Sequence, residues 1–332
     1  MLPISLLDLA PIAEGASVAE ALQMSRQMAQ TAENHGYHRY WLAEHHGMAA
    51  VASSATAVLL SHIGQATRSI RIGSGGVMLP NHSPLIIAEQ FGMLAELYPN
   101  RVDLGLGRAP GTDMLTARAL RRNMDVAVEQ YPEDVRELQR LLGDEQTGSL
   151  RAVPGANTKV PIWMLGSSLY SAQVAAQFGL PYSFASHFAP DQLLQALTVY
   201  RRNFTPSAEL SVPHTMAGVM VVVADTDEEA QYLFTSAQQQ FMNLRRDRNR
   251  AFPPPVDTME GLWSPSEKHM VDHMLQYAMV GSPASVAFKL SRFVAQTQVN
   301  ELIVSMPIHD PQARLKSVAL MAQVKQSLEQ DA

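Results

Sequence analysis

The sequence predicts an α/β protein built as a closed (β/α)8 TIM barrel. Short apolar runs typical of β-strands alternate with helical patterns, and eight such runs are found. Some of them, such as VMVVVA at Val219–Ala224, are apolar on both faces, as strands of a parallel sheet covered by helices must be. The expected strands are Ile4–Leu9, Arg39–Glu44, Ile70–Leu79, Val102–Gly107, Val160–Leu165, Tyr182–Ser186, Met216–Ala224 and Glu301–Met306.

Capping signals indicate where the helices between these strands begin. Ser17 and Glu20 form a capping box ahead of the first helix. Ser83-Pro84 supplies an N-cap followed by proline at the first helical position, and that helix should end before Pro99. Ser282-Pro283 opens another helix in the same way, just ahead of the last strand. The pattern of strand, helix and strand therefore extends along the chain.

Two connections are too long for a minimal barrel and predict insertions after strands 4 and 7. They run from Ala109 to Lys159 and from Asp225 to Asn300. Within the second, residues 245–280 are expected at the barrel mouth, where they would form a lid, a dimer contact or an excursion without function. No repeat or flexible linker interrupts the chain, so residues 1–332 are expected to form a single domain.

Composition narrows the classes of function. The net charge is −6 and no basic stripe occurs, which disfavours nucleic acid and anionic membrane as partners and favours a small molecule. The absence of cysteine excludes disulfides, cysteine nucleophiles and thiolate metal sites. The opening MLPISLLDLAP has no basic segment, and no apolar run approaches the ~20 residues of a membrane span. We therefore expect a cytoplasmic protein without a membrane segment.

Polar residues gather where the expected strands end. In a TIM barrel the chemistry lies at the carboxyl ends of the strands, so these residues should face one site. A lone histidine or serine at such a place is usually structural, but convergence of several strand ends points to function. The strand ends are Asp8, Glu44-His45-His46, Ser74-Gly75-Gly76, Gly107-Arg108, Gly166-Ser167-Ser168 and Ser186-His187.

Two kinds of site fit these residues poorly. A metal hydrolase would draw on His45, His46, His82 and His187. Adjacent residues on a strand point to opposite faces, however, and no H-x-H or H-E-x-x-H pairing occurs, so no metal is expected. A dinucleotide site is suggested by DLGLGRAPG, but its third glycine, Gly111, stands one place late and no acidic residue ends a second strand at the required distance.

A phosphate-bearing cofactor fits better. Ser167 and Ser168 stand where a helix begins, so their hydroxyls and the first backbone N–H groups face outward with the positive end of the helix dipole. Ser171 lies one turn further on. Together with Arg108 these residues form a candidate phosphate clamp. The alternative is an ordinary serine cap, which would be preferred without Arg108.

The third expected strand contains three small residues in succession, Ser74, Gly75 and Gly76. Glycine in a strand interior weakens the strand and usually marks a bulge or a closely approaching ligand. A plain bulge is the simpler interpretation of these residues alone.

Four segments closely resemble the bacterial luciferase-like flavin monooxygenases. They are RYWLAEHH, IRIGSGGVMLPNHSPLIIAEQFGMLAELYPNRVDLGLGRAPGTD, WMLGSSLYSAQVAAQFGLPYSFASHF and VGSPASVAFKL. The resemblance extends from Ile4 to about Ala322 and is greatest to the single-chain members. It implies a (β/α)8 barrel that binds FMN, with reduced FMN supplied by a separate NAD(P)H:flavin reductase. In this family O2 adds at the flavin C4a carbon, and the resulting peroxide attacks an organic substrate, such as an aldehyde or ketone.

The resemblance also assigns residues. Arg108, Ser167, Ser168 and Ser171 match phosphate contacts, His45 matches the active-site histidine, and Gly75-Gly76 match a non-prolyl cis peptide beneath the isoalloxazine ring. A homodimer through the early helices is also implied. The chain departs from the luciferases at Gly107, where they have a reactive cysteine, and at Ser167, where they have an acidic residue. Light emission is not implied.

Two alternatives stay open within the same fold. A deazaflavin-dependent relative of the superfamily transfers hydride without oxygen. The other alternative is a flavin-binding protein without catalytic activity, although the presence of His45 argues against it. The substrate itself is not predicted, because the pocket wall would come from the two insertions, and such loops vary freely on a constant barrel.

Overall fold

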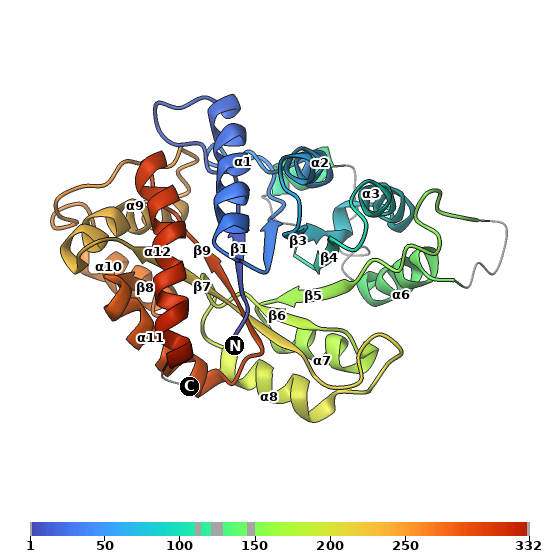
Figure 1. Cartoon of the computed structure of the whole chain (residues 1–332). Helices are drawn as coiled ribbons and strands as arrows, with labels where there is room; N and C mark the ends of the chain where they lie inside the picture. Colours follow the sequence, from blue (N-terminus) through green and yellow to red (C-terminus); the bar gives the residue numbers. More distant parts are fainter. Residues whose placement is uncertain (1, 110–113, 121–128, 145–149, 331–332) are drawn as a thin grey trace.

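Eight parallel strands close into a barrel in the computed structural model, which describes residues 2–109, 114–120, 129–144 and 150–330 (Figure 1). Neighbouring strands pair in sequence order, and the ring closes where β7 pairs with β9 and β9 with β1. All eight expected strands are confirmed. They are β1 (Ile4–Asp8), β2 (Arg39–Leu42), β3 (Arg71–Met78), β4 (Val102–Gly107), β5 (Ile162–Gly166), β6 (Tyr182–Phe184), β7 (Thr215–Val223) and β9 (Glu301–Ser305).

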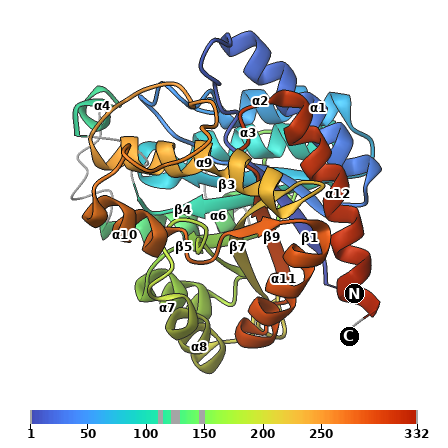
Figure 2. The same ribbon diagram turned by 90° about the vertical axis from the view of Figure 1, so that its left-hand side faces the viewer.

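Helices surround the barrel on its outside, as Figures 1 and 2 show from two directions. No helix in the described ranges combines the length and apolarity needed to cross a membrane. The helices are α1 (Val18–Asn34), α2 (Thr56–Ala66), η1 (Leu79–Asn81), α3 (Pro84–Leu97), α4 (Met114–Ala119), α6 (Tyr131–Leu142), α7 (Leu169–Phe178), α8 (Leu193–Asn203), α9 (Asp227–Arg245), α10 (Pro265–Met274), α11 (Pro283–Thr297) and α12 (Pro311–Gln330).

The expected helix starts are confirmed. The Ser17–Glu20 capping box is formed in full, and the Ser282 side chain accepts a hydrogen bond from the Ser285 N–H at the start of α11. The two long connections follow β4 and β7 as expected, and residues 110–113, 121–128 and 145–149 of the first lie outside the described residues. The second holds α9, α10 and α11 together with a short strand, β8 (Met279–Gly281), which the sequence analysis did not predict. This strand pairs with the far end of β7.

Alternate residues of each strand serve two different cores, because successive side chains point to opposite faces. Leu6 faces outward and joins the large cluster between barrel and helices, whereas Leu7 faces inward. The inward cluster also contains Trp41, Trp163 and Ile303. Trp41 and Trp163 pack edge to face, with ring centroids 5.4 Å apart. This inner cluster forms the floor beneath the barrel mouth.

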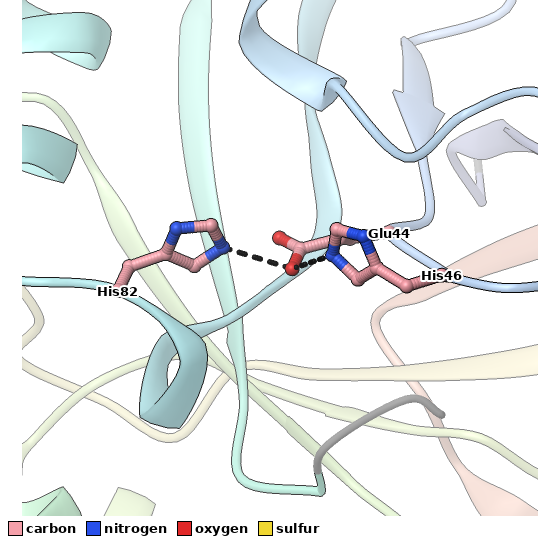
Figure 3. Close-up of side chains that lie close together, drawn as sticks. All are labelled: Glu44, His46 and His82. Carbon is pink, nitrogen blue, oxygen red and sulfur yellow. Dashed lines mark hydrogen bonds and ion pairs between the residues drawn. The ribbon is translucent and has the colours of Figure 1, made fainter. Parts of the chain in front are cut away.

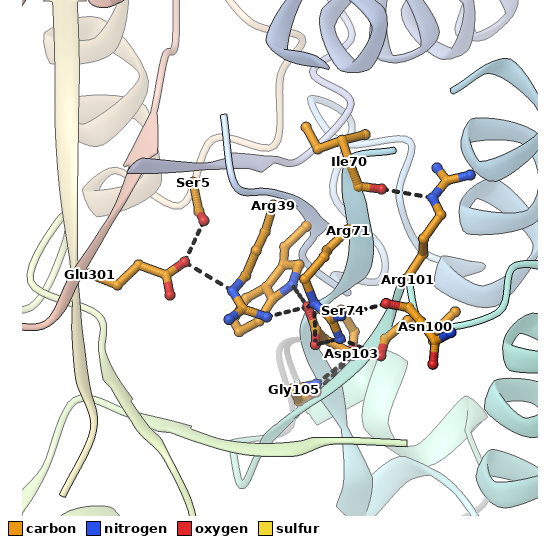
Figure 4. Close-up of polar contacts among 12 residues, drawn as sticks. Ser5, Arg39, Ile70, Arg71, Ser74, Asn100, Arg101, Asp103, Gly105 and Glu301 are labelled. Atoms are coloured by element: carbon orange, nitrogen blue, oxygen red, sulfur yellow. Dashed lines mark hydrogen bonds and ion pairs between the residues drawn. The ribbon is translucent and has the colours of Figure 1, made fainter. Parts of the chain in front are cut away.

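A buried ion-pair network closes the amino-terminal end of the barrel (Figure 4). Arg39, the first residue of β2, binds Glu301 at 2.9 Å and Asp103 at 2.6 Å. Arg71, the first residue of β3, also binds Asp103, and the Ser5 hydroxyl donates to Glu301. Each buried charge thus has opposite charges as partners, as buried ions require. This end is sealed, which leaves the carboxyl ends of the strands for the site.

Candidate active site

A cavity of about 530 Å³ opens at the carboxyl ends of the strands. All seven residues that the sequence suggested for the site line it, from four successive strand ends and one helix. This volume lies within the range of small-molecule and cofactor sites. Among the described residues that line it, the ionisable ones are His45, Arg108, His187 and Arg314, and none is a carboxylate. The predicted residues are His45, Gly75, Gly76, Arg108, Ser167, Ser168 and Ser171.

The wall formed by β4, β5 and α7 carries the candidate phosphate clamp. Ser168 is the N-cap of α7, yet its side chain makes no capping hydrogen bond. Arg108 lies over the Tyr170 ring, 4.1 Å from its centroid, which fixes its guanidinium beside the helix start. The Ser171 hydroxyl donates to the Ser168 carbonyl at 2.9 Å. Ser171 therefore holds the first turn in shape, while Ser168 keeps its hydroxyl available at the helix N-terminus.

The peptide bond between Gly75 and Gly76 is cis, at the place that the resemblance implied. A β-bulge lies there as well, because the register of β3 against β4 shifts between Gly75 and Val77. A Cβ at Gly76 would lie 2.6 Å from the Gly105 carbonyl oxygen, whereas one at Gly75 would lie 2.6 Å from a Leu7 methyl. Close packing of the strands thus requires glycine at Gly76, independently of any ligand, while the backbone of both residues lines the cavity.

His45 and His46 point in different directions after β2. His45 lines the cavity. His46 instead turns to Glu44, whose Oε1 also accepts from His82, both at 2.8 Å (Figure 3). The other carboxylate oxygen of Glu44 accepts from the Met78 N–H at the end of β3. Glu44 therefore ties the segment that contains His45 to the end of β3 and to the segment that follows it.

The surroundings of Glu44 strongly favour the ionised form of its carboxyl group. Burial by itself would raise the pKa of this carboxyl, but hydrogen bonds from His46 and His82 and the Met78 amide lower it to about 2. The ligand atoms of Glu44, His46 and His82 lie within 4.8 Å of one another, as they would in a metal site. The sequence analysis did not bring these three together, and its expectation of no metal stays a prediction.

Two of the polar strand ends serve the structure instead. Asp8 is fully buried and accepts from Arg314, Ser25 and Tyr40. Burial raises its pKa and these partners lower it, with a net lowering. The Ser186 hydroxyl donates to the Gly218 carbonyl at 2.6 Å. Neither side chain is available to a ligand.

His187 differs from Ser186, because it lines the cavity. Burial and then the nearby His45 lower the pKa of His187 to about 4, so its imidazole is neutral at pH 7. Sequence reasoning placed His187 at a strand end and considered it only as a ligand in the disfavoured metal site. It also missed Gln240 of α9 and Ser305 of β9, which line the same cavity and carry no motif. The inward direction of Gln240 follows from tertiary packing, whereas Ser305 shares the inward face of β9 with Ile303, two positions earlier.

Residues 3–301 match the luciferase-like monooxygenase family. A protein of Escherichia coli K12 called luciferase-like monooxygenase is 52% identical over 325 residues, which cover 98% of this chain and 97% of that one. The N-acetyl-S-alkylcysteine monooxygenase of Bacillus subtilis is 32% identical over 329 residues, covering 97% and 98%. The crystal structure of apo-MsnO8 superposes with a TM-score of 0.92 at 32% identity, covering 98% and 99%.

More distant structures share the fold alone. The oxygenating constituent of 3,6-diketocamphane monooxygenase, solved in complex with FMN, has a TM-score of 0.72 at 16% identity, covering 97% of this chain and 96% of that one. An F420-dependent secondary alcohol dehydrogenase has a TM-score of 0.71 at 14% identity, covering 98% and 99%. With the family match over most of the chain and close relatives over nearly all of it, the chain belongs to the luciferase-like monooxygenase family.

Proposed function

We propose that this protein is an FMN-dependent monooxygenase that uses reduced FMN and O2 to insert one oxygen atom into a small organic substrate. The observation that carries the proposal is the convergence of Arg108, the serines at the start of α7, the Gly75-Gly76 backbone and His45 on one cavity. The family supports oxidoreductase chemistry of this kind.

The donor set of the cavity fits FMN. A phosphate dianion would meet the Arg108 guanidinium, the Ser168 hydroxyl and the N-terminus of α7, and no carboxylate of the described lining would repel it. The flat ring would lie against the bare backbone of Gly75 and Gly76, where no side chain intervenes. Reduced FMN, when bound, supplies through its C4a carbon the electrons that activate O2.

The residues of the chain then have separate tasks. Arg108, Ser167 and Ser168 bind the phosphate, and the Ser171 side chain supports the turn that presents it. Gly75 and Gly76 position the ring. His45 lines the cavity and moves a proton at the reacting end, since imidazole is the side chain that serves most often as general acid and base in proteins.

A direct experiment tests this function. FMN is added to the purified apoprotein and quenching of flavin fluorescence is followed. A generic NAD(P)H:flavin reductase, NAD(P)H and 18O2 are then supplied with straight-chain aldehydes, ketones and thioethers, and products are scored by mass. Incorporation of one labelled oxygen atom is expected. Tight binding of F420 in place of FMN, with hydride transfer and no oxygen uptake, would instead favour the deazaflavin alternative, which the fold likeness to an F420-dependent dehydrogenase keeps open.

We also propose that two copies associate through the early helices. Ile86, Met93 and Leu97 of α3 are about half exposed, and their spacing places them along one side of the helix. Val58 of the adjacent helix α2 is 73% exposed. Large apolar side chains gathered on neighbouring helices are typical of an interface.

A further inference from the structure

A second, smaller space of about 270 Å³, here called the side hollow, lies beside the active-site cavity. It is lined by α1 and the segment that leads into α12, two helices that lie side by side in Figures 1 and 2. Ala21 and Met24 of α1 and Ile308 give it an apolar wall. Glu20 and Gln23, which also line it, are exposed, so the side hollow opens to solvent.

Among the described residues, three line both the active-site cavity and the side hollow, and they are Pro11, Phe252 and Arg314. A residue that contacts two separate spaces stands between them, so these three form a partition. Arg314 is paired with the buried Asp8 at 2.6 Å. Of the three, Phe252 alone contributes a large apolar side chain, and truncation of that side chain would join the two spaces without breaking an ion pair.

Phe252 is fixed in the partition by its backbone and by its ring. Its N–H donates to the Ile12 carbonyl and its carbonyl accepts from the Glu14 N–H, both at 2.8 Å. The ring stacks on the imidazole of His309, with centroids 6.5 Å apart and 22° between the planes. Phe252 is therefore a packed part of the wall, although it belongs to the long insertion after β7.

The partition lies on the side of the barrel opposite the proposed phosphate clamp. Pro11 follows β1, and Arg314 stands in the first turn of α12, after β9. Arg108 and Ser168 follow β4 and β5, which are halfway round the ring of strands from β9 and β1. A substrate that shares the cavity with FMN would thus extend toward the partition.

The room on that side is limited and its walls are apolar. A cavity of about 530 Å³ is within the range of sites that hold a single cofactor or drug-sized ligand, so bound FMN would leave space only for a short substrate. Leu9 at the end of β1 and Met306 and Pro307 after β9 line the cavity on the partition side. These side chains favour an apolar part of the substrate.

We propose that Phe252 sets the length limit of the substrate, which carries an apolar tail that ends against this ring. A longer tail would pass into the side hollow if the ring were absent. This inference rests on the proposed function, because it assigns the opposite wall of the cavity to FMN.

A homologous series of linear alcohols measures the limit. The FMN-loaded parent protein is titrated by calorimetry with 1-butanol through 1-decanol, which differ only in the number of methylenes. Each methylene that is buried should tighten binding about fourfold, until the tail meets Phe252 and the rise stops. In Phe252→Ala the rise should continue for at least about two further methylenes, which corresponds to a gain of roughly 15-fold for the longer alcohols.

Two control variants separate this effect from a general loosening of the cavity. Phe241→Ala removes the same ring from α9, which lines the active-site cavity but is not among the described residues of the side hollow, and the rise should stop at the parent chain length. Met24 lines the side hollow alone of the two spaces. The double variant Phe252→Ala/Met24→Trp fills the side hollow from its far wall and should restore the parent limit.

Each other outcome overturns the proposal. A rise that stops at the same chain length in the parent and in Phe252→Ala would show that the ring is not the limit. A rise that continues unbroken to 1-decanol in the parent, or no binding of any alcohol, would show that no such tail site exists. An equal extension in Phe241→Ala, or a limit that does not return in the double variant, would place the longer tail outside the side hollow.

The fold and the proposed function are checked separately. If melting shows that Phe252→Ala does not fold, Phe252→Leu takes its place, because leucine keeps an apolar side chain in the partition but is shorter than phenylalanine. Failure of the parent protein to bind FMN would refute the proposed function. The same titrations without FMN would still locate the chain length at which Phe252 stops the rise.

Discussion

Glu44 binds His82, which lies 38 positions further along the chain, with Oε1 of the carboxylate 2.8 Å from Nε2 of the imidazole. This contact joins the end of β2 to the segment that follows β3, and the same oxygen accepts from His46. It thus ties the segment that contains His45 to the segment after β3. Because the carboxylate is 2% exposed, its charge depends on these partners.

The Glu44 contacts predict a pH-dependent loss of stability. The pKa of Glu44 is lowered from 4.5 to about 2, so its ionisation stabilises the folded state by about 3 kcal/mol above pH 4.5. That contribution should fall as pH drops from 4.5 toward 2. Glu44→Gln should therefore be less stable than the parent at pH 7 by roughly this amount, with a difference that shrinks in acid. Urea unfolding at pH 7, 4 and 3 measures it, and a difference independent of pH would contradict the assignment.

Arg108→Ala is expected to weaken FMN much more than riboflavin. The substitution removes a charge-assisted contact to phosphate worth about 1.5–3 kcal/mol, which corresponds to roughly 10- to 150-fold in FMN affinity. Riboflavin has no phosphate and serves as the internal control. Fluorescence titration measures both ligands. Equal losses for the two would remove Arg108 from the phosphate site.

Gly76→Ala should destabilise the protein more than Gly75→Ala. The new methyl at Gly76 would meet the Gly105 carbonyl of β4, which is backbone and cannot move aside, whereas the one at Gly75 meets the end of the Leu7 side chain. Overpacking of this kind costs about 1–3 kcal/mol. Thermal melting compares the two variants. Valine at either position should also abolish FMN binding, and a folded variant that binds FMN normally would contradict the placement of the ring.

The local sequence pattern predicted the strands of the barrel but not the side-chain contacts in and around the cavity. The eight strands are recoverable because each is an apolar run that alternates with helical patterns, whereas β8 (Met279–Gly281) lies inside the insertion after β7 and is defined by its pairing with the end of that strand. The seven predicted site residues follow strand ends or motifs. The bond between Glu44 and His82, and the inward direction of Gln240, depend on how distant segments pack, which spacing does not encode.

Charge placed on the α3 face should break the proposed dimer. Met93→Glu puts a carboxylate on an apolar side chain that is 52% exposed, where a partner copy would have to bury it. The variant should sediment as a monomer with an unchanged melting temperature. Val212→Glu, at a loop position with 65% exposure, is the control and should leave the association state as it is. A parent protein that is already monomeric would refute the interface.

The adjacent histidines His45 and His46 allow the catalytic role to be separated from the structural one. His45 lines the cavity, so His45→Ala should keep the melting temperature and FMN affinity. Substrate oxidation should fall at least tenfold, because positioned acid–base groups commonly contribute ~10²- to 10⁴-fold to the rate. Release of hydrogen peroxide should persist, because O2 still reaches the reduced flavin.

His46→Ala should behave in the opposite way. It removes one of the hydrogen bonds that hold Glu44, so it should lower the melting temperature while turnover per folded molecule stays near that of the parent. Oxidation rate, melting temperature and FMN affinity are measured for both variants under the same conditions. A His45→Ala protein that oxidises substrate at the parent rate would remove His45 from the mechanism. One that unfolds would make His45 structural, because a side chain that only transfers a proton contributes to the rate and not to the fold.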